Sequence, residues 1–108
     1  MPEIERYQAL VIGSGEAGKY LAWTMAKAGH RTAVVERRYI GGSCPNIACL
    51  PSKNVIRSAK VASLVARRAE FGVETDRVTI DMKAVQRRKR TMVEDLLADV
   101  VSKGNLRV

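Results

Sequence analysis

The sequence predicts an α/β fold: a parallel βαβ unit followed by two further helices. Residues 7–12, "YQALVI", form a short apolar run that is typical of a buried strand and ends at a glycine-rich turn. Residues 31–36, "RTAVVE", form a second such run, and the segment 16–30 between them is rich in helix-favouring residues. Strand, helix and strand within about 30 residues predict parallel strands joined by a right-handed crossover.

The helix expected over residues 16–30 should bury one face and end at Gly29, because glycine is favoured directly after the last helical turn. His30, next to this glycine, is expected to be an exposed turn residue. The positions that can share the buried face are Ala17, Tyr20, Leu21, Met25 and Ala28.

A second helix is expected from Ser52 to Glu70, and Gly72 should break it. The apolar positions that recur there at helical spacing are Val55, Ile56, Ala59, Val61, Ala62 and Val65. The following "VTI", residues 78–80, is either a short strand or an extended linker.

Asp81 is the expected N-cap of a long last helix that runs to about Ser102. Gly104 is expected to cap its C-terminal end, and the "LRV" after it to begin another strand, beside the first. The residues expected on the buried side of this helix are Met82, Val85, Met92, Val93, Leu96, Leu97 and Val100.

The composition is that of one small globular domain, with 108 residues of which 46% are hydrophobic. Lysine and arginine number 19 against 11 acidic residues, and this net charge of +8 raises nucleic acid or an anionic surface as a partner. The basic residues cluster at 67–68 and 87–90, within helical segments and with few aromatic residues between them. Solvated helix faces explain this pattern better, so nucleic acid is disfavoured as a partner.

The chain is expected to be cytoplasmic, with no membrane partner. No apolar run approaches the ~18 residues of a membrane span, and the N-terminal "MPEIERYQ" lacks the basic-then-apolar pattern of a signal peptide. Thiols are mostly reduced in the cytoplasm, so a close cysteine pair there favours redox chemistry or metal binding over a structural disulfide.

The motif "GSGEAG" places Gly13, Gly15 and Gly18 in the GxGxxG pattern, between a predicted strand and a predicted helix. Gly13 permits the tight turn, Gly15 leaves room for a pyrophosphate, and Gly18 lets the helix pack close to the sheet. The free N–H groups of the helix N-terminus suit phosphate groups. The motif in this setting predicts dinucleotide binding.

Glu36, at the end of the second strand, lies 18 residues after Gly18, close to the spacing of a ribose-binding acid. Its carboxylate can accept hydrogen bonds from both ribose hydroxyls and would repel a 2′-phosphate, which favours FAD or NAD over NADP. Arg37 and Arg38 weaken the preference against NADP, because either could pair with a phosphate. We therefore count Arg37 among the candidate cofactor-binding residues.

Both cysteines lie in "GGSCPNIACLPSK", residues 41–53. Two Cα atoms five positions apart in a regular helix are separated by about 8.6 Å, beyond the ~7 Å limit for a disulfide. We expect Pro45 to push Cys44 out of helical geometry, and Pro51 to make a helix kink or restart. A pair at such an irregular helix entrance suits a reversible disulfide, although two inert buried thiols remain an alternative.

A metal site is disfavoured at this pair. Structural zinc sites commonly need four ligands, and the chain holds two cysteines and a single histidine, His30, at the end of the first helix.

Together, "GSGEAG", Glu36 and "GGSCPNIACLPSK" resemble the N-terminal part of the FAD-dependent pyridine nucleotide–disulfide oxidoreductases. That family includes dihydrolipoamide dehydrogenase, glutathione reductase and mercuric reductase, and its signature is roughly GGTCxNxGCxPSK. The resemblance runs from about Tyr7 to Lys53. It implies that residues 1–108 form the N-terminal part of an FAD-binding domain with an incomplete Rossmann-like fold.

The resemblance implies a role for each matching residue toward FAD. Gly13, Gly15 and Gly18 would hold the pyrophosphate and Glu36 the adenosine ribose. Gly42 and Ser43 would contact the phosphates or the ribityl chain, and Lys53 would lie beside the isoalloxazine ring.

The resemblance also implies the roles of the thiols. Cys49 would face the flavin in a thiolate charge-transfer contact, and Cys44 would be the interchange thiol that attacks the substrate. Electrons would pass between NAD(P)H, FAD and the Cys44–Cys49 disulfide. Ser43 and Ala48 depart from the usual Thr and Gly without removing a group that the chemistry needs. The segment "SCPNIACLPSKN" weakly favours the mercuric-reductase-like branch of the family.

The resemblance further implies an incomplete enzyme. The NAD(P)-binding domain, the dimerisation domain and its His–Glu acid–base pair are expected to be absent, so the chain should be inactive alone. Its partners would be FAD and the remainder of the enzyme or a complementing chain, in a family that is usually homodimeric. Two alternatives stay open: a stand-alone thiol-redox or flavin-binding module, and a basic nucleic-acid-binding protein that uses a nucleotide-binding fold.

Overall fold

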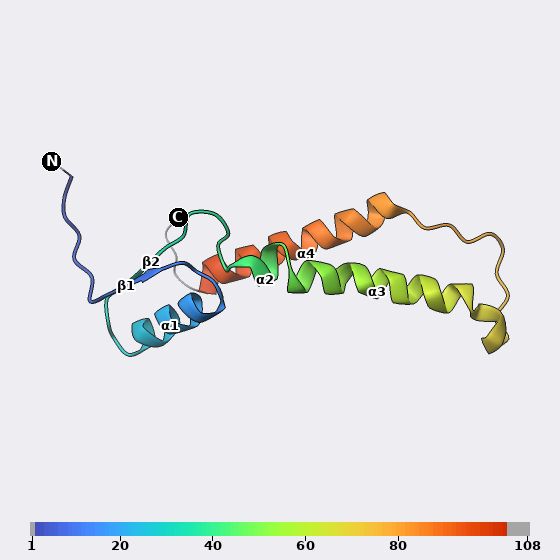
Figure 1. Cartoon of the computed structure of the whole chain (residues 1–108), viewed down its shortest axis with the longest axis horizontal. Coiled ribbons are helices and arrows are strands. Elements are labelled where there is room, and N and C mark those ends of the chain that lie inside the picture. Colours follow the sequence, from blue (N-terminus) through green and yellow to red (C-terminus); the bar gives the residue numbers. More distant parts are fainter. Residues whose placement is uncertain (1, 104–108) are drawn as a thin grey trace.

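The computed structural model describes residues 2–103 as a small α/β body from which a long helical hairpin projects (Figure 1). The predicted Gly104 cap and the strand at "LRV" lie outside these residues. The elements in chain order are β1 (Ala9–Ile12), α1 (Glu16–Lys27), β2 (Thr32–Val35), α2 (Ser43–Asn46), α3 (Cys49–Ala66), a 3₁₀ turn (Arg68–Phe71) and α4 (Met82–Lys103).

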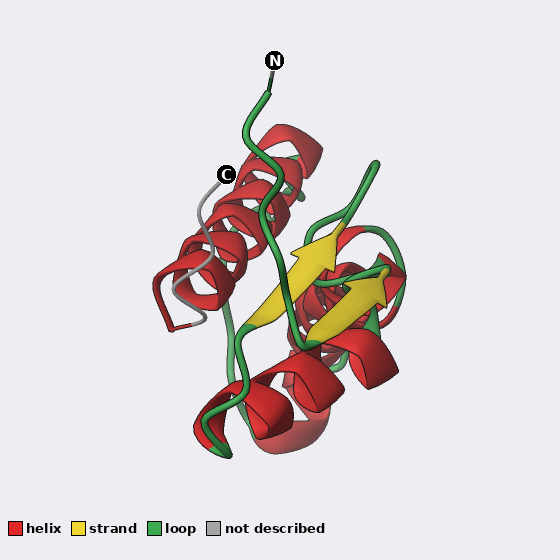
Figure 2. Cartoon of the chain, turned by 90° about the vertical axis from the view of Figure 1, so that its left-hand side faces the viewer, coloured by secondary structure: helices red, strands yellow, loops and turns green. Residues whose placement is uncertain are grey.

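The predicted βαβ unit is confirmed. Strands β1 and β2 are parallel and in direct register, with Leu10 opposite Ala33 and Ile12 opposite Val35. Figure 2 shows the two strands side by side and helix α1 along one side of them. Leu10 and Ile12 alternate with half-buried residues and are 61% and 85% exposed, so α1 covers one face of the sheet and leaves the other open.

The face of α1 that packs on the sheet differs from the predicted one. Ala22 is buried and Met25 half-buried, whereas Tyr20 and Leu21 are 56% and 54% exposed. Ala17 and Ala28 are exposed as well, so only Met25 was predicted correctly. The cause is the close approach at Gly18, which turns the positions four and seven residues later toward the strands.

At Gly18, helix α1 packs closely against β1 and the turn that follows it. A Cβ atom built there would lie 2.0 Å from the carbonyl oxygen of Gly13 and 3.3 Å from Cγ1 of Val11. No side chain fits in that space, which confirms that this glycine lets the helix pack close to the sheet.

Helices α3 and α4 form the antiparallel hairpin on the other side of the molecule (Figure 1). The chain measures 69 × 29 × 18 Å, and its radius of gyration of 20.5 Å exceeds the about 13 Å of a compact domain of this length. The buried residues of the described part of the chain are Ser14, Ala22, Gly41, Pro45 and Pro51, so no large aliphatic or aromatic side chain is buried there. The hairpin therefore shields its apolar residues only partly.

The apolar positions predicted from the sequence match the buried side of α4 well and that of α3 less well. On α4, Met82 is 64% exposed at the start of the helix, next to the loop that connects α3 and α4, and the other predicted positions are half-buried. On α3, only Ala62 and Val65 of the apolar stripe are half-buried. Polar Asn54 and Ser58 occupy the rest of the contact face, so the apolar periodicity did not locate it.

The predicted N-cap of α4 holds, but both ends of α3 are shifted: α3 ends at Ala66 rather than Glu70, and a separate 3₁₀ turn follows it. The backbone N–H of Ala84 donates to Oδ1 of Asp81 at 3.0 Å, which confirms the N-cap of α4. Gly72 ends the 3₁₀ turn with a left-handed φ of 67°, and residues 78–80 are extended without strand pairing. Helix α3 begins at Cys49, three residues earlier than expected. Pro51 is tolerated in its first turn, because a backbone N–H at that position would have no acceptor within the helix.

No helix among residues 2–103 is long and apolar enough to cross a membrane.

Replacing Gly18 by alanine should destabilise the fold by more than about 3 kcal/mol, because the methyl group overlaps a backbone carbonyl that cannot move without breaking the turn. Gly15→Ala is the matched control. A Cβ atom at Gly15 meets nothing within 4 Å, and its φ of −64° suits alanine. Urea unfolding followed by circular dichroism measures both variants. Equal stability of the two would contradict the close packing at Gly18.

Candidate functional site

The glycine loop joins β1 to α1 and leaves an open space at the helix N-terminus. Gly13 has a φ of 95°, a conformation that favours glycine, and its N–H donates to the carbonyl of Val35 at 2.7 Å. Gly15 is the N-cap of α1, without a side-chain cap of its first N–H groups. A Cβ atom at Gly13 or Gly15 would meet no atom within 4 Å, so the space beside these two residues is free for a ligand.

Ser14, in the same loop, is a buried residue that connects the loop to the chain after β2. Its N–H and hydroxyl donate to Oε2 of Glu36 at 2.9 and 2.8 Å. Its hydroxyl accepts a hydrogen bond from the N–H of Gly41 at 3.0 Å. The sequence pattern did not single out Ser14, because the middle position of GxG accepts many residues, and only tertiary contacts reveal its role.

Glu36 is held in place by backbone and hydroxyl donors. In addition to Ser14, the N–H of Arg38 donates to its Oε1 at 2.9 Å. These hydrogen bonds, led by that from the Ser14 N–H, lower the pKa of Glu36 from 4.5 to about 2. The carboxylate is therefore ionised at neutral pH and fixed beside the glycine loop, and its two oxygens retain capacity for a further donor.

The turn before the cysteines packs directly on the glycine loop. Gly42 has a φ of 87°, and a Cβ atom built on it would lie 2.6 Å from Cα of Gly15. The side-chain amide of Asn46 donates to the carbonyls of Ile40 and Gly42 at 2.8 and 2.7 Å. Asn46 was not predicted as a site residue, although its place in the "CPN" of the cysteine motif is a signal that could have identified it.

The two cysteines lie on either side of a helix break. Cys44 is the second residue of α2, Cys49 is the first residue of α3, and Ile47 and Ala48 between them are non-helical. The predicted irregular entrance is thus confirmed. The expectation that Pro45 pushes Cys44 out of helical geometry is wrong, because Pro45 is the third residue of α2, in the first turn, where its missing N–H costs nothing.

The thiols of Cys44 and Cys49 are unbridged and contact each other. Cys44 is half-buried and Cys49 exposed. A hydrogen bond with Cys49, followed by burial, raises the pKa of the Cys44 thiol. The break between α2 and α3 therefore brings together two thiols that a continuous helix would hold apart.

The remaining predicted residues differ in their placement. Lys53 is exposed and lies one turn after Cys49 on α3, so it shares the helix face of that thiol. Ser43 begins α2 and is exposed, and its carbonyl accepts the N–H groups of Ile47 and Ala48. Arg37 is exposed beside Glu36. His30 is exposed at the end of α1, as predicted.

Among residues 2–103, no group of three or more His, Cys, Asp or Glu side chains lies close enough to hold a metal ion.

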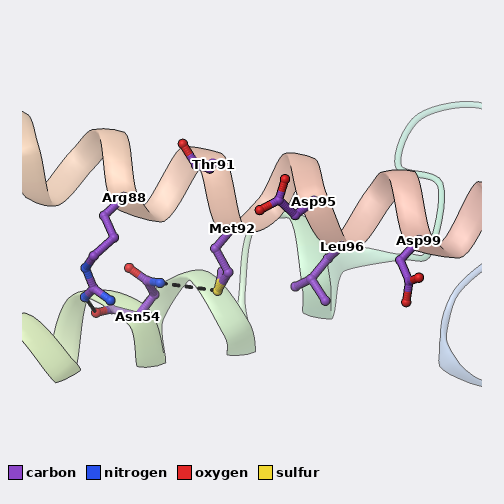
Figure 3. A pocket seen from close by; sticks show the side chains of 7 residues that line it. All are labelled: Asn54, Arg88, Thr91, Met92, Asp95, Leu96 and Asp99. Carbon is purple, nitrogen blue, oxygen red and sulfur yellow. Dashed lines mark hydrogen bonds between the residues drawn. The ribbon is translucent and has the colours of Figure 1, made fainter.

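An open groove of about 670 Å³ runs between α3 and α4 (Figure 3). The side chains that line it are Asn54, Arg88, Thr91, Met92, Asp95, Leu96 and Asp99. The amide of Asn54 donates to the Met92 sulfur at 3.3 Å, and the Arg88 guanidinium donates to the carbonyl of Asn54. None of the predicted site residues lines this groove, so the glycine loop and the thiols form a separate site.

Residues 7–105 match the family described as pyridine nucleotide-disulphide oxidoreductase. The chain belongs to this family. The resemblance seen in the sequence is confirmed, and so is the α/β fold of an incomplete Rossmann-like domain. The members of the family are FAD-dependent and use NAD(P)H, so the cofactor prediction is confirmed at the level of the family.

Relatives of the family cover nearly all of this chain. It is 38% identical over 105 residues to dihydrolipoyl dehydrogenase of Bacillus subtilis (strain 168), across 94% of this chain and 22% of that protein. The match to dihydrolipoyl dehydrogenase of Chlamydia pneumoniae is 38% identical over 92 residues, across 85% and 20%.

A solved structure agrees with these relatives. The Cu(II) complex of the HOCl-induced flavoprotein disulfide reductase RclA from Escherichia coli matches with a TM-score of 0.71 and 33% identity, across 90% of this chain and 19% of that chain. The chain therefore spans about a fifth of the length of the relatives it matches, and it corresponds to part of a flavin-dependent disulfide oxidoreductase.

The described residues fit an FAD molecule. The space beside Gly13 and Gly15 is open, at the uncapped N-terminus of α1, where N–H groups and the helix dipole favour a pyrophosphate. The ionised Glu36 is fixed next to that loop with acceptor capacity left. Gly18 and Gly42 are different, since their missing side chains serve backbone packing and leave no ligand space.

Glu36→Gln should make the stability of the chain less dependent on pH. The lowered pKa of Glu36 contributes stability that is complete above about pH 4.5 and is lost as the pH falls through about 2. The free energy of unfolding of the parent should therefore exceed that of the variant at neutral pH, and the two values should converge toward pH 2. Urea unfolding at a series of pH values measures this difference.

Glu74→Gln, in the exposed loop before α4, is the control for loss of one carboxylate and should show no such convergence. A constant difference between parent and Glu36→Gln from pH 2 to 7 would contradict the assigned hydrogen-bond network.

Proposed function

We propose that this chain provides the FAD-binding loop and the redox-active dithiol of a flavin-dependent disulfide oxidoreductase. The observation that carries the proposal is the direct contact between the glycine loop and the cysteine segment at Gly15 and Gly42. Because Gly42 lies two residues before Cys44, a cofactor held at the loop and the reactive thiols belong to one site.

Each residue of the loop has a task toward FAD. Gly13 and Gly15 leave room for the pyrophosphate, Gly18 keeps the helix N-terminus close, and Glu36 accepts from the adenosine ribose. Gly42 and Ser43 lie where the chain leads from the loop to the thiols, and the exposed Arg37 can pair with a phosphate. When bound, FAD would pass electrons between NAD(P)H and the Cys44–Cys49 pair.

The dithiol performs the exchange with a substrate disulfide. Cys44 loses its proton to water and its thiolate attacks one substrate sulfur, which forms a mixed disulfide and releases the other sulfur as a thiolate. Cys49 in turn loses its proton to water, and its thiolate attacks the Cys44 sulfur, releases the second substrate thiolate and leaves a Cys44–Cys49 disulfide. Two electrons and no heavy atoms have passed from the protein to the substrate.

A complete catalytic cycle also needs an acid–base partner for the thiols and a site for NAD(P)H. His30, the one histidine of the sequence, lies past the C-terminal end of α1, at the opposite end of that helix from the glycine loop. It cannot serve as acid–base partner of the thiols. The NAD(P)H site and this acid–base group would come from the remainder of the enzyme, and the chain alone would turn over no substrate.

The thiol assignment predicts an intramolecular disulfide between Cys44 and Cys49 under mild oxidation. Equilibration of the chain in glutathione redox buffers, followed by alkylation and mass spectrometry, should show a two-thiol form and an internally bridged form. Cys44→Ser and Cys49→Ser should each leave one alkylatable thiol and form no internal bridge. Two thiols that stay free in the parent throughout the oxidising range would overturn the redox proposal.

The cofactor assignment predicts that Gly15→Ala weakens FAD binding at least about tenfold, because its methyl group occupies space needed by the pyrophosphate. Quenching of flavin fluorescence on titration with the chain measures the affinity. Since the same variant should keep its fold, loss of binding cannot be ascribed to unfolding. Absence of any flavin binding by the parent chain would refute FAD binding by this portion alone.

A further inference from the structure

Lys19 is the most shielded charged side chain in an ion pair of the described residues, with 11% of its side-chain surface exposed. It lies on the second turn of α1, and its Nζ atom is 2.7 Å from Oε1 of Glu16. The same atom donates to the carbonyl of Gly41 at 3.4 Å and lies 5.4 Å from the centre of the Tyr20 ring. A lysine is seldom this shielded without a specific partner.

The contact with Gly41 makes Lys19 part of the support of the cysteine segment. Gly41 is buried, with a φ of 88°, and its N–H donates to the Ser14 hydroxyl. The glycine loop and the helix after it thus hold both polar groups of Gly41, one through Ser14 and the other through Lys19. Cys44 follows Gly41 by three residues.

The pair Lys19 and Glu16 also acts on the charge of the Cys44 thiol. The titratable groups that act on this thiol are Cys49 on α3 and Glu16 and Lys19 on α1. Cys49, burial and the Glu16 carboxylate raise the pKa of Cys44, in that order, and the Lys19 ammonium lowers it. The two members of one ion pair therefore have opposite effects on the same thiol.

We propose that Lys19 is a positioning residue for the interchange thiol: from α1 it contacts the Gly41 carbonyl, three residues before Cys44, and brings to this segment a cation that Glu16 offsets. This inference rests on the proposed function, in which Cys44 is the thiol that attacks the substrate. Lys19 directly follows Gly18, the third glycine of the motif. Through its contact with Gly41 it connects the glycine loop to the segment of the reactive thiol. Its counterpart Glu16 sets how much of that positive charge Cys44 experiences.

The test measures the reactivity of Cys44 alone. In the Cys49→Ser chain, the rate of alkylation by the uncharged reagent iodoacetamide as a function of pH reports the thiolate fraction of Cys44. Lys19→Met should lower the rate at neutral pH by about two- to fivefold, the effect expected of one partly screened charge. Glu16→Gln should raise it by a similar factor, and Lys19→Arg, which keeps the charge, should restore most of the parent rate.

Lys27→Met, at the far end of α1, is the matched control and should leave the pH profile unchanged. Unchanged profiles in Lys19→Met and Glu16→Gln, or shifts in the same direction, would overturn the proposal. If Lys19→Met fails to fold by circular dichroism, the Glu16→Gln shift decides alone. The outcome is separate from that of the proposed function, because failure of the Cys44–Cys49 disulfide to form would leave this single-thiol measurement readable.

Discussion

The backbone of Gly42 lies against the backbone of Gly15, so close that a Cβ atom on Gly42 would not fit. This contact joins two loops that are 27 residues apart in the chain, and Ser14 and Asn46 reinforce it with hydrogen bonds on either side. Because the contact is between main chains, it positions Cys44 relative to the N-terminus of α1 with little freedom. The glycine loop and the cysteine segment are thus held together, although they come from separate sequence motifs.

Charge at this site is arranged by the same contacts. Hydrogen bonds from the loop, led by that of the Ser14 N–H, lower the pKa of Glu36 and fix its carboxylate, so the negative charge expected at a ribose site is held in place before any ligand binds. Around Cys44, by contrast, a hydrogen bond with Cys49, burial and the Glu16 carboxylate raise the pKa of the thiol, and the Lys19 ammonium lowers it.

The sequence could predict the features that depend on neighbouring residues. The strands, the turn at Gly13, the N-cap Asp81 and the break caused by Pro51 each follow from local backbone chemistry, and all appear in the structure. The glycine and cysteine motifs located the site for the same reason. The packing face of α1 could not be predicted from periodicity, because Tyr20 and Leu21 suggest an apolar face while the missing side chain of Gly18 decides the contact. On α3, Asn54 and Ser58 pack toward α4 through polar contacts that a hydrophobic pattern does not register.

By itself, the sequence determined the βαβ order, the glycine-rich turn, the acidic residue after β2 and a cysteine pair that no regular helix can bridge. These properties depend on the covalent chain and its allowed dihedral angles over a few residues. Only the tertiary structure decided that Gly42 rests on Gly15, that Ser14 binds Glu36 and Gly41, and that Lys19 lies close to the thiol segment. Those relations depend on how closely α1 approaches β1 and where the chain returns after β2, and these distances result from packing between segments that are remote in sequence.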